Sequence, residues 1–377
     1  MDSLVLRSHH AGSNPTLATG CCSRVSNRWS IDWSGVGRKK WRSDRPVRIA
    51  LEGWRGIADL ARYAPTPHNT QPFRICPRDA HSADIIVLRE RLLPHEDHGN
   101  LYMVSAFGIL AVTMQLAAQQ LGLNVEISRN PSIDPATLHS QGGQIVIGTA
   151  VITGTCTPVQ GSDLLTVRRT SRLPYHDRLV DSTALTAFRD IVTARGHRFI
   201  QHDKQDVVSR ILRLNADALI DNLRLDDERE EIRHWYRTGN TPLYGDGLWQ
   251  QPMNQPAWEI RSAFAFPHLF SLPGLRQFAA HRYLRTQAGT RHIGLLCGPF
   301  HQAAELHAAG EALMELWLEM ARVGVYMQPM GSMLTNPRYA TEIARTLHVD
   351  DCWLVFRFGY GDPPPQAPRL QSILIDE

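Results

Sequence analysis

The stretch APTPHNTQPF, residues 64–73, determines how the first part of this chain folds, because three prolines, two threonines, an amide pair and a histidine lie within ten residues. Each proline fixes its own φ and restricts the residue before it to extended geometry, so a preceding helix must end here. The segment therefore presents a stiff backbone that holds its polar side chains at fixed points. Two interpretations are open: a helix-to-strand connector in which Asn69 and Thr70 satisfy local backbone groups, or a loop that binds a ligand.

The segments around this loop predict a first half with the order α, β, β, α, β, β. Apolar residues at helical spacing occupy 50–64, and the loop stops that helix. FRICP and ADIIVLRE follow as two strand-like runs, and NVEISR and GGQIVIGTAVI, rich in β-branched residues, supply two more. Between the two pairs, residues 100–123 are apolar almost all round and end at Gly122, which predicts a buried helix with a glycine cap.

The second half begins near Gly161 and alternates helices with strands. The pattern predicts helices over 182–195, 204–225, 226–238 and 303–325, and strands at HRFIQ, RHIGLLCG and CWLVFRFGYG. Residues 238–258, rich in Pro and Gly, are either a functional lid or a surface excursion. LAAQQLGL and LEMARVGV form a weak internal repeat, because each ends a long apolar helix at a glycine turn.

Composition excludes several functional classes. The chain has 377 residues, 43% hydrophobic and 20% charged, with a formal charge of +3, too balanced to indicate a nucleic-acid partner. Its six cysteines have no metal-ligand spacing and no disulfide framework, so we expect no metal and a reducing cytoplasm. No apolar run approaches the roughly 20 residues that span a bilayer, and we expect no membrane.

Residues 1–46 are rich in Ser, Gly, Asn and Arg and lack apolar periodicity, which predicts a disordered lead that is dispensable for folding. A transit peptide or a misassigned start codon is also compatible with this composition. We expect the first folded half over 47–160 and the second over 161–377, with a lid insertion at about 226–258.

Two further clusters are candidates for chemistry. RRTSR places Arg168, Arg169 and Arg172 around Thr170, and forked guanidiniums suit phosphate; a solvated basic turn is the alternative. YMQPMGSML, residues 326–334, contains a glycine turn at Met330 and Gly331; a helix C-terminus with methionine packing is the alternative.

Taken together, these clusters resemble a known family. APTPHNTQPF resembles the AP[ST]xHNTQPW signature of nitroreductase-fold flavoproteins, RRTSRLPYHDRLV is similar to their arginine motif, and FRFGYGDPPPQAPRL resembles their closing strand, proline run and arginine. The order of the motifs is similar to the single-chain, Acg-like branch. Phe73 in place of tryptophan and Pro67 between Thr66 and His68 depart from the pattern.

The resemblance implies an α+β, nitroreductase-like fold with two degenerate, pseudo-symmetric halves in one chain, in which mixed or antiparallel sheets pack on long central helices. It implies FMN, with NAD(P)H as possible co-substrate. It places Arg168, Arg169, Thr170 and Arg369 at the phosphate, and Arg172 at the pyrimidine edge of the ring, where a cation supports the reduced state. From the opposite side it brings four residues of the proline loop, namely Thr66, His68, Asn69 and Gln71. It also implies that the backbone of the turn at Met330 and Gly331 lies near the reactive N5 edge of the flavin.

Two functions follow from the resemblance. The first is ping-pong hydride transfer from NAD(P)H to flat acceptors such as nitro compounds or quinones, with the flavin carrying the chemistry. The alternative is an FMN storage or sequestering protein with a lid and little turnover. The sequence does not name the acceptor or choose between NADH and NADPH. Because RRTSR and the proline loop each occur once, we expect one FMN per chain and a monomer that acts as an intrachain pseudo-dimer.

Overall fold

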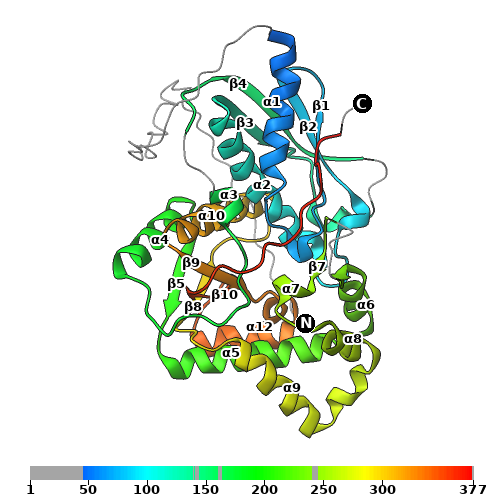
Figure 1. The fold of residues 1–377 in the computed structure, drawn as a ribbon, viewed down its shortest axis with the longest axis vertical. Helices are drawn as coiled ribbons and strands as arrows, with labels where there is room; N and C mark the ends of the chain where they lie inside the picture. The colour runs from blue at the N-terminus through cyan, green and yellow to red at the C-terminus, as the bar shows by residue number, and fades with distance from the viewer. Residues whose placement is uncertain (1–45, 139, 141–143, 160–163, 240–244, 376–377) are drawn as a thin grey trace, which may run out of the picture. The chain divides into compact units, whose positions relative to one another are not determined.

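The computed structural model describes residues 46–138, 140, 144–159, 164–239 and 245–375, for which it gives an α+β fold (Figure 1). The predicted lead falls outside these residues except for Pro46, where the first helix begins. Part of the predicted lid, 240–244, also lies outside them.

The first half has the predicted order of elements. Helix α1 ends before the proline loop, and the remaining elements follow as two pairs of strands separated by a helix. Their bounds are α1 Pro46–Ala61, β1 Phe73–Pro77, β2 Ser82–Val87, α2 Leu101–Gln120, β3 Leu123–Arg129 and β4 Ile145–Thr155, with 3-10 turns at Pro67–Asn69, Arg89–Arg91, His98–Asn100 and Pro135–Thr137. The strands form an antiparallel sheet in the order β1-β2-β4-β3.

The second half contains every predicted element and several that the sequence did not predict. The predicted ones are α4 Ser182–Ala194, β5 Arg198–His202, α5 Gln205–Asn222, α6 Asp226–Trp235, β8 His292–Cys297, α10 Ala303–Arg322 and β10 Cys352–Tyr360. The additional ones are α3 Leu164–Val167, β6 Tyr236–Arg237, β7 Leu248–Trp249, α7 Gln250–Met253, α8 Ala257–Ala265, the 3-10 turn η5 Pro267–Ser271, α9 Pro273–Thr286, β9 Val325–Pro329, α11 Ser332–Thr335 and α12 Pro337–Leu347. An antiparallel sheet in the order β5-β8-β10-β9 results.

The two sheets have the same topology. If α4, β5, β8, α10, β9 and β10 are matched to α1, β1, β2, α2, β3 and β4, the strand orders are identical. Helices α2 and α10 are each 20 residues long. Both are followed at the same distance by a glycine with positive φ, Gly122 at 74° and Gly324 at 72°.

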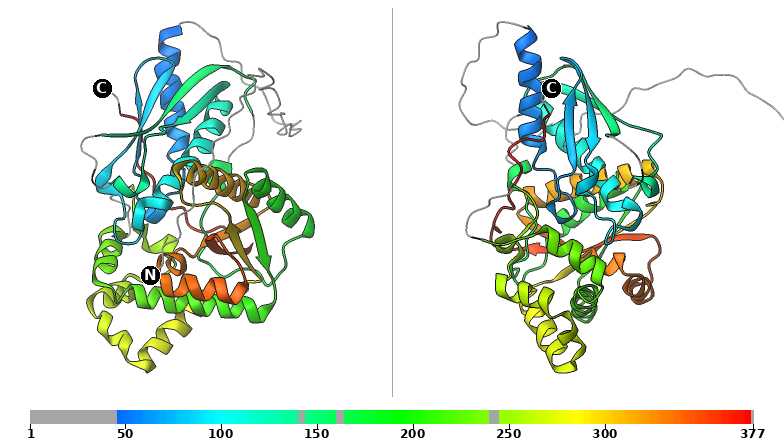
Figure 2. Two further views of the ribbon diagram at one scale, coloured as in Figure 1. Left: turned by 180° about the vertical axis from the view of Figure 1, so that it is seen from behind. Right: turned by 90° about the vertical axis from the view of Figure 1, so that its right-hand side faces the viewer.

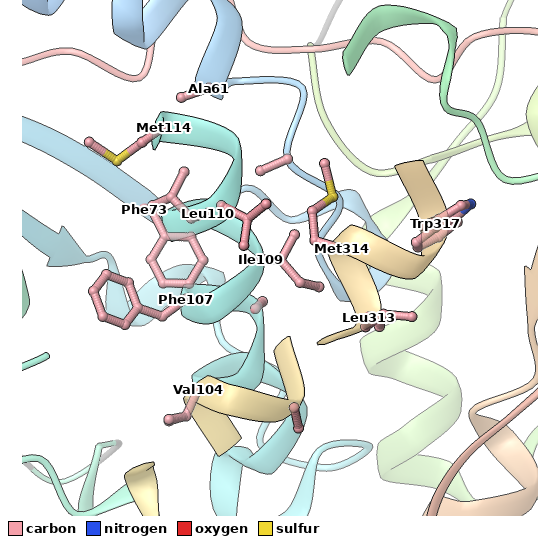
Figure 3. Packing of buried hydrophobic residues seen from close by; sticks show 14 of the residues in the cluster. Ala61, Phe73, Val104, Phe107, Ile109, Leu110, Met114, Leu313, Met314 and Trp317 are labelled. Atoms are coloured by element: carbon pink, nitrogen blue, oxygen red, sulfur yellow. The ribbon is translucent and has the colours of Figure 1, made fainter. Parts of the chain in front are cut away.

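Helices α2 and α10 pack against each other in the apolar core (Figure 3), and a matched pair of glycines lies where their backbones meet. Gly108 and Gly310 are each the eighth residue of their helix. A Cβ on Gly108 would lie 2.0 Å from the carbonyl oxygen of His307, and one on Gly310 would lie 1.8 Å from that of Ser105. Because no side chain fits there, the two backbones approach closely and one apolar core continues through both halves.

The expectation that no apolar run reaches bilayer length is wrong for one helix. Residues 98–120 are long and apolar enough to cross a membrane, but 78% of the apolar window is buried inside the described chain. The helix is apolar all round because α1, the first sheet and α10 cover it, as Figures 1 and 3 show.

The second sheet is covered on both faces, and every residue of its inner strand β8 is buried. Helix α10 belongs to the large core, whereas side chains of α5 and α12 pack on the sheet in a separate cluster that includes Ile211, Leu295, Ile343 and Val355.

The C-terminal segment returns from the second sheet to the first. After β10 it runs along α1 to the edge of β1, where Ile75 donates a hydrogen bond to the Ile373 carbonyl (2.8 Å) and accepts one from the Ile375 amide (2.9 Å). This path, drawn in red in Figure 1, carries Arg369 past the proline loop.

Candidate functional site

A cavity of about 1130 Å³ lies between the proline loop, the α2–α10 crossing and the helices of residues 257–286. Its walls are mostly apolar. The predicted site residues that line it are Thr66, His68, Thr170, Arg172, Met330 and Gly331; Arg168, Arg169, Asn69, Gln71 and Arg369 are not among its lining residues.

The proline loop is strained in a way that only its contacts explain. His68, Asn69 and Gln71 all have positive φ, at 47°, 55° and 49°. Non-glycine residues rarely adopt this conformation, and they do so where the surroundings hold them. The Thr66 hydroxyl accepts a hydrogen bond from the Gln71 amide at 2.9 Å and closes the loop on itself.

Asn69 and Gln71 bind other parts of this chain. Asn69 Nδ2 donates to the carbonyls of Gly247 (3.2 Å) and Pro368 (3.0 Å). Gln71 Nε2 donates to the Gly245 carbonyl at 2.7 Å, and its Oε1 accepts from the Leu370 amide at 3.0 Å. The two amides thus fasten residues 245–247 and the C-terminal segment to the loop.

The arginine motif is positioned by strand β9. Thr170 forms a parallel bridge with Met327, and the Ser171 amide donates to the Met327 carbonyl at 3.0 Å. This pairing extends the second sheet by one short segment and directs Arg168 towards α10, where its guanidinium lies 4.6 Å from the centre of the Trp317 ring. Trp317 lines the cavity, so Arg168 lies directly behind the cavity wall.

Arg168 and Arg369 meet at the end of helix α1. Nη2 of each donates to the Tyr63 carbonyl, at 3.2 and 3.3 Å, and Arg369 also donates to Asn69 Oδ1. Arg168 Nε and Nη1 and Arg369 Nε are buried without a hydrogen-bond partner in the described chain. Burial, followed by the nearby Arg369, lowers the pKa of Arg168 to about 9, and burial lowers that of Arg369 to about 10. Two cations that share one acceptor and have buried nitrogens without a partner fit an anion.

Arg169 and Arg172 diverge from this pair. Arg169 Nη1 donates to the Pro364 carbonyl at 2.8 Å. Arg172 points into the cavity beside Tyr283, whose hydroxyl accepts from Asn215 Nδ2 at 2.6 Å. Burial lowers the pKa of Arg172 to about 10, which leaves it protonated at neutral pH.

The glycine turn of residues 326–334 is a strand-to-helix turn and not a helix C-terminus. Strand β9 ends at Pro329, the Met330 amide donates to the Val355 carbonyl at 2.8 Å, and α11 starts at Ser332. A Cβ on Gly331 would meet no atom within 4 Å, so the backbone is open to the cavity at this point.

A carboxylate that the sequence did not indicate pairs with His68. Glu96 Oε2 lies 2.7 Å from His68 Nε2, and both residues line the cavity. Burial lowers the pKa of His68, but the Glu96 carboxylate outweighs it, so the net shift is upwards. The Glu231 carboxylate accepts a hydrogen bond from the Glu96 backbone amide at 2.9 Å and so holds Glu96 in place. His68, Glu96 and Glu231 are far apart in the sequence. No local pattern therefore indicated that Glu96 would lie beside His68.

Arg357 holds the end of the arginine motif, residues 168–172, by hydrogen bonds to its backbone. It is fully buried in β10, where Nη2 donates to the carbonyls of Leu173 (2.9 Å) and Ser171 (3.4 Å), and its guanidinium lies 4.1 Å from the Tyr175 ring centre. A lone arginine in the apolar strand CWLVFRFGY was a readable signal for a buried polar contact.

No protein-family model matches the chain, and no curated protein matches it. Similar solved structures are FMN-dependent nitroreductases. One is NfnB from Mycobacterium smegmatis in complex with NADPH, at 16% identity over 53% of this chain and 86% of that chain, with a TM-score of 0.29. Two others, both with bound FMN, come from Desulfitobacterium hafniense (12% identity, 55% and 95% coverage, TM-score 0.32) and Bacteroides fragilis (11%, 58% and 100%, TM-score 0.34). At TM-scores this low, the similarity carries no argument about what this chain does.

Proposed function

We propose that this chain is an FMN-binding oxidoreductase of the nitroreductase type that transfers hydride from NAD(P)H to a flat acceptor. The observation that supports this most is the pair Arg168 and Arg369, which share one acceptor and have buried nitrogens without a partner in the described chain, with Arg168 packed on Trp317 of the cavity wall. A phosphate would satisfy those nitrogens, and the cavity is large enough for a planar ring with space beside it.

Each residue then has a defined task. Arg168 and Arg369 hold the phosphate, with Arg169 and Thr170 beside them. Arg172 stabilises negative charge at the pyrimidine edge, and Gly331 lets backbone approach the ring. FMN supplies reversible two-electron chemistry when bound. His68 lines the cavity and pairs with Glu96, whose carboxylate raises the His68 pKa, so the imidazole is placed to exchange a proton there.

We further propose that the chain is a tandem, Acg-like arrangement of two degenerate halves. The identical strand orders and the matched glycines of α2 and α10 support this. The candidate site then combines the proline loop of one half with the arginine motif of the other, in the manner of two subunits.

The test is anaerobic mixing of the FMN-loaded protein with NADH and with NADPH while flavin absorbance is followed. Rapid bleaching by either nucleotide, and recovery of colour on addition of a quinone, supports the oxidoreductase. Persistent colour with both contradicts it.

One observation favours the alternative of FMN storage. Ile232, Tyr236, Leu248 and Met253 of the predicted lid insertion line the cavity, and residues of 257–286 add to the same wall. Persistent colour combined with slow release of FMN, which speeds up when these residues are deleted, would identify a storage protein.

A further inference from the structure

The segment of residues 257–286, here called the α8–α9 segment, is apolar but has almost nothing buried. It consists of α8, the 3-10 turn η5 and α9, and of these thirty described residues only Ala263 is buried. The segment lies at the end of the described fold opposite the first sheet (Figures 1 and 2). Helix α9 contacts α5, where Arg276 pairs with Asp217 and Asp221, but much of the apolar surface of the segment stays uncovered. Helices of soluble proteins normally bury one face, so this surface is unusual.

Its exposed side chains are large. Among the large apolar side chains of the described residues, the exposed fractions are highest for Trp258 (68%) and Phe278 (66%), and Phe266 and Leu272 follow at 53%. Trp258, Phe266 and Phe278 are the only exposed aromatic residues among the large apolar side chains of the described chain. Within the segment, Leu269, Leu272 and Leu275 are exposed as well. A contiguous group of this kind marks a docking surface.

The cavity opens through the same surface. Five side chains are both exposed and part of the cavity wall: Trp258, Phe266, Leu269, Leu275 and Phe278. Whatever covers the segment therefore also covers the entrance to an apolar cavity. If the covering partner is a lipid phase, a molecule dissolved in it could enter the cavity without passing through water.

The charges around the surface match an anionic partner. The segment has four arginines and one glutamate, and Arg282 neutralises that glutamate, Glu259, with Nε 2.6 Å from Oε1. Arg276 is bound to Asp217 and Asp221 of α5. Arg261 and Arg285 are exposed; Arg285 lines the cavity, and Arg261 donates a hydrogen bond to the Thr238 hydroxyl.

We propose that the α8–α9 segment is a docking surface for an anionic lipid bilayer. Trp258, Phe266 and Phe278 enter the boundary between head groups and acyl chains, where amphipathic aromatic rings are favoured, while Arg261 and Arg285 contact lipid phosphates. A cavity that opens towards the bilayer would take a flat molecule dissolved in the lipid. The reduction of such a molecule rests on the proposed function, whereas docking on the bilayer does not require FMN.

The experiment is flotation of the full-length protein, with and without FMN, on vesicles of phosphatidylcholine alone and of phosphatidylcholine with phosphatidylglycerol. We expect binding to the anionic vesicles, weaker binding to the neutral ones, and at least a tenfold loss in the double variant Trp258→Ser/Phe278→Ser. The matched control, Leu179→Ser/Leu225→Ser, alters exposed apolar residues elsewhere and should bind as the wild type does.

A second variant protects the test against misfolding. Arg261→Glu/Arg285→Glu leaves every aromatic residue in place and should reduce binding to the anionic vesicles only. Absence of flotation on both vesicle types, or equal flotation of all variants, overturns the proposal. So does a wild-type dimer in light scattering that becomes monomeric in Trp258→Ser/Phe278→Ser, because the surface would then bind a second copy of this chain.

Discussion

Arg168 and Arg369 place two like charges at one carbonyl oxygen, and this arrangement has opposite consequences for the empty and the loaded protein. Without an anion, two desolvated cations repel each other. Arg168→Met should keep the packing on Trp317 and leave the melting temperature of the FMN-free protein unchanged or higher. The same change should weaken FMN binding by about one to two decades, since it removes a charge-assisted contact of roughly 1.5 to 3 kcal/mol.

Fluorescence titration with FMN measures the affinity, and Arg178→Met is the matched control, because Arg178 is exposed and pairs with Asp181. An unchanged FMN affinity in Arg168→Met would reduce RRTSR to a structural turn.

Arg172 lies in the cavity and retains its charge, so its effect should appear in the flavin's potential. Replacing it with Met removes a cation from the reduced ring, and the two-electron midpoint potential should become more negative by on the order of 30 mV, equivalent to about 1.4 kcal/mol. Equilibration with xanthine oxidase and a reference dye measures the shift; a potential equal to that of the wild type contradicts the assignment.

Glu228 of α6 provides a pH-dependent prediction. Burial, followed by repulsion from Glu96 and Glu231, raises its pKa to about 7. Because the folded pKa lies above the unfolded value, the stability that Glu228 contributes is present below about pH 4 and is lost as pH rises through about 7. Glu228→Gln should therefore match the wild type near pH 5 and exceed it at pH 8.

The expected gain at pH 8 is on the order of 1 to 2 kcal/mol after allowance for partial solvation. Urea unfolding at the two pH values measures it. Glu230→Gln, on the exposed side of the same helix, should show no such pH dependence; a similar gain in that variant would point to net charge as the cause.

The residue scale also shows what the sequence could predict. The clusters around Thr66, Arg168 and Gly331 were visible because prolines, paired arginines and glycines are local signals. The tasks of Asn69 and Gln71 were not, since their partners Gly245 and Pro368 are far away in the chain. Glu96 was missed for the same reason.

At the scale of elements, the α2–α10 crossing depends on Gly108 and Gly310. Gly108→Ala would place a Cβ 2.0 Å from the His307 carbonyl oxygen, so the helices must separate. We expect destabilisation of about 3 kcal/mol or more, because backbone atoms cannot yield as a side chain would. Gly154→Ala in β4 is the control, since its Cβ would meet no atom within 4 Å. Equal unfolding midpoints for the two variants in guanidinium would contradict close backbone packing.

Elements with strong periodicity were predictable, and several that depend on distant pairing or bury no face were not. Helices α2 and α10 and strands β8 and β10 have long apolar patterns. Strand β9 has five residues and is defined by pairing with β10 and Thr170, which local sequence does not encode. Helix α9 has no buried residue, so no apolar face marked it. Helix α12 had a readable start, because Asn336 caps it ahead of Pro337.

At the scale of the whole molecule, only one of the two matched positions has the features of an anion site among the described residues. The turn after α4 corresponds to the proline loop after α1. Its cation, Arg195, is neutralised by Glu311 at 2.9 Å and by Glu315 of α10. Phe300 and Trp353 stack nearby at 4.9 Å, and Trp353 Nε1 donates to His197. The cation at that position is thus balanced by carboxylates, which supports the prediction of a single phosphate site.

Flavin stoichiometry measured together with molar mass tests the composite site most directly. Purified protein is saturated with FMN, bound flavin is counted by absorbance against protein concentration, and light scattering gives the mass of the same sample. The account predicts one FMN per chain on a species of 42.4 kDa plus flavin, retained on dilution. Two flavins per chain, or flavin that is lost as a dimer dissociates, would contradict a single site built from both halves of one chain.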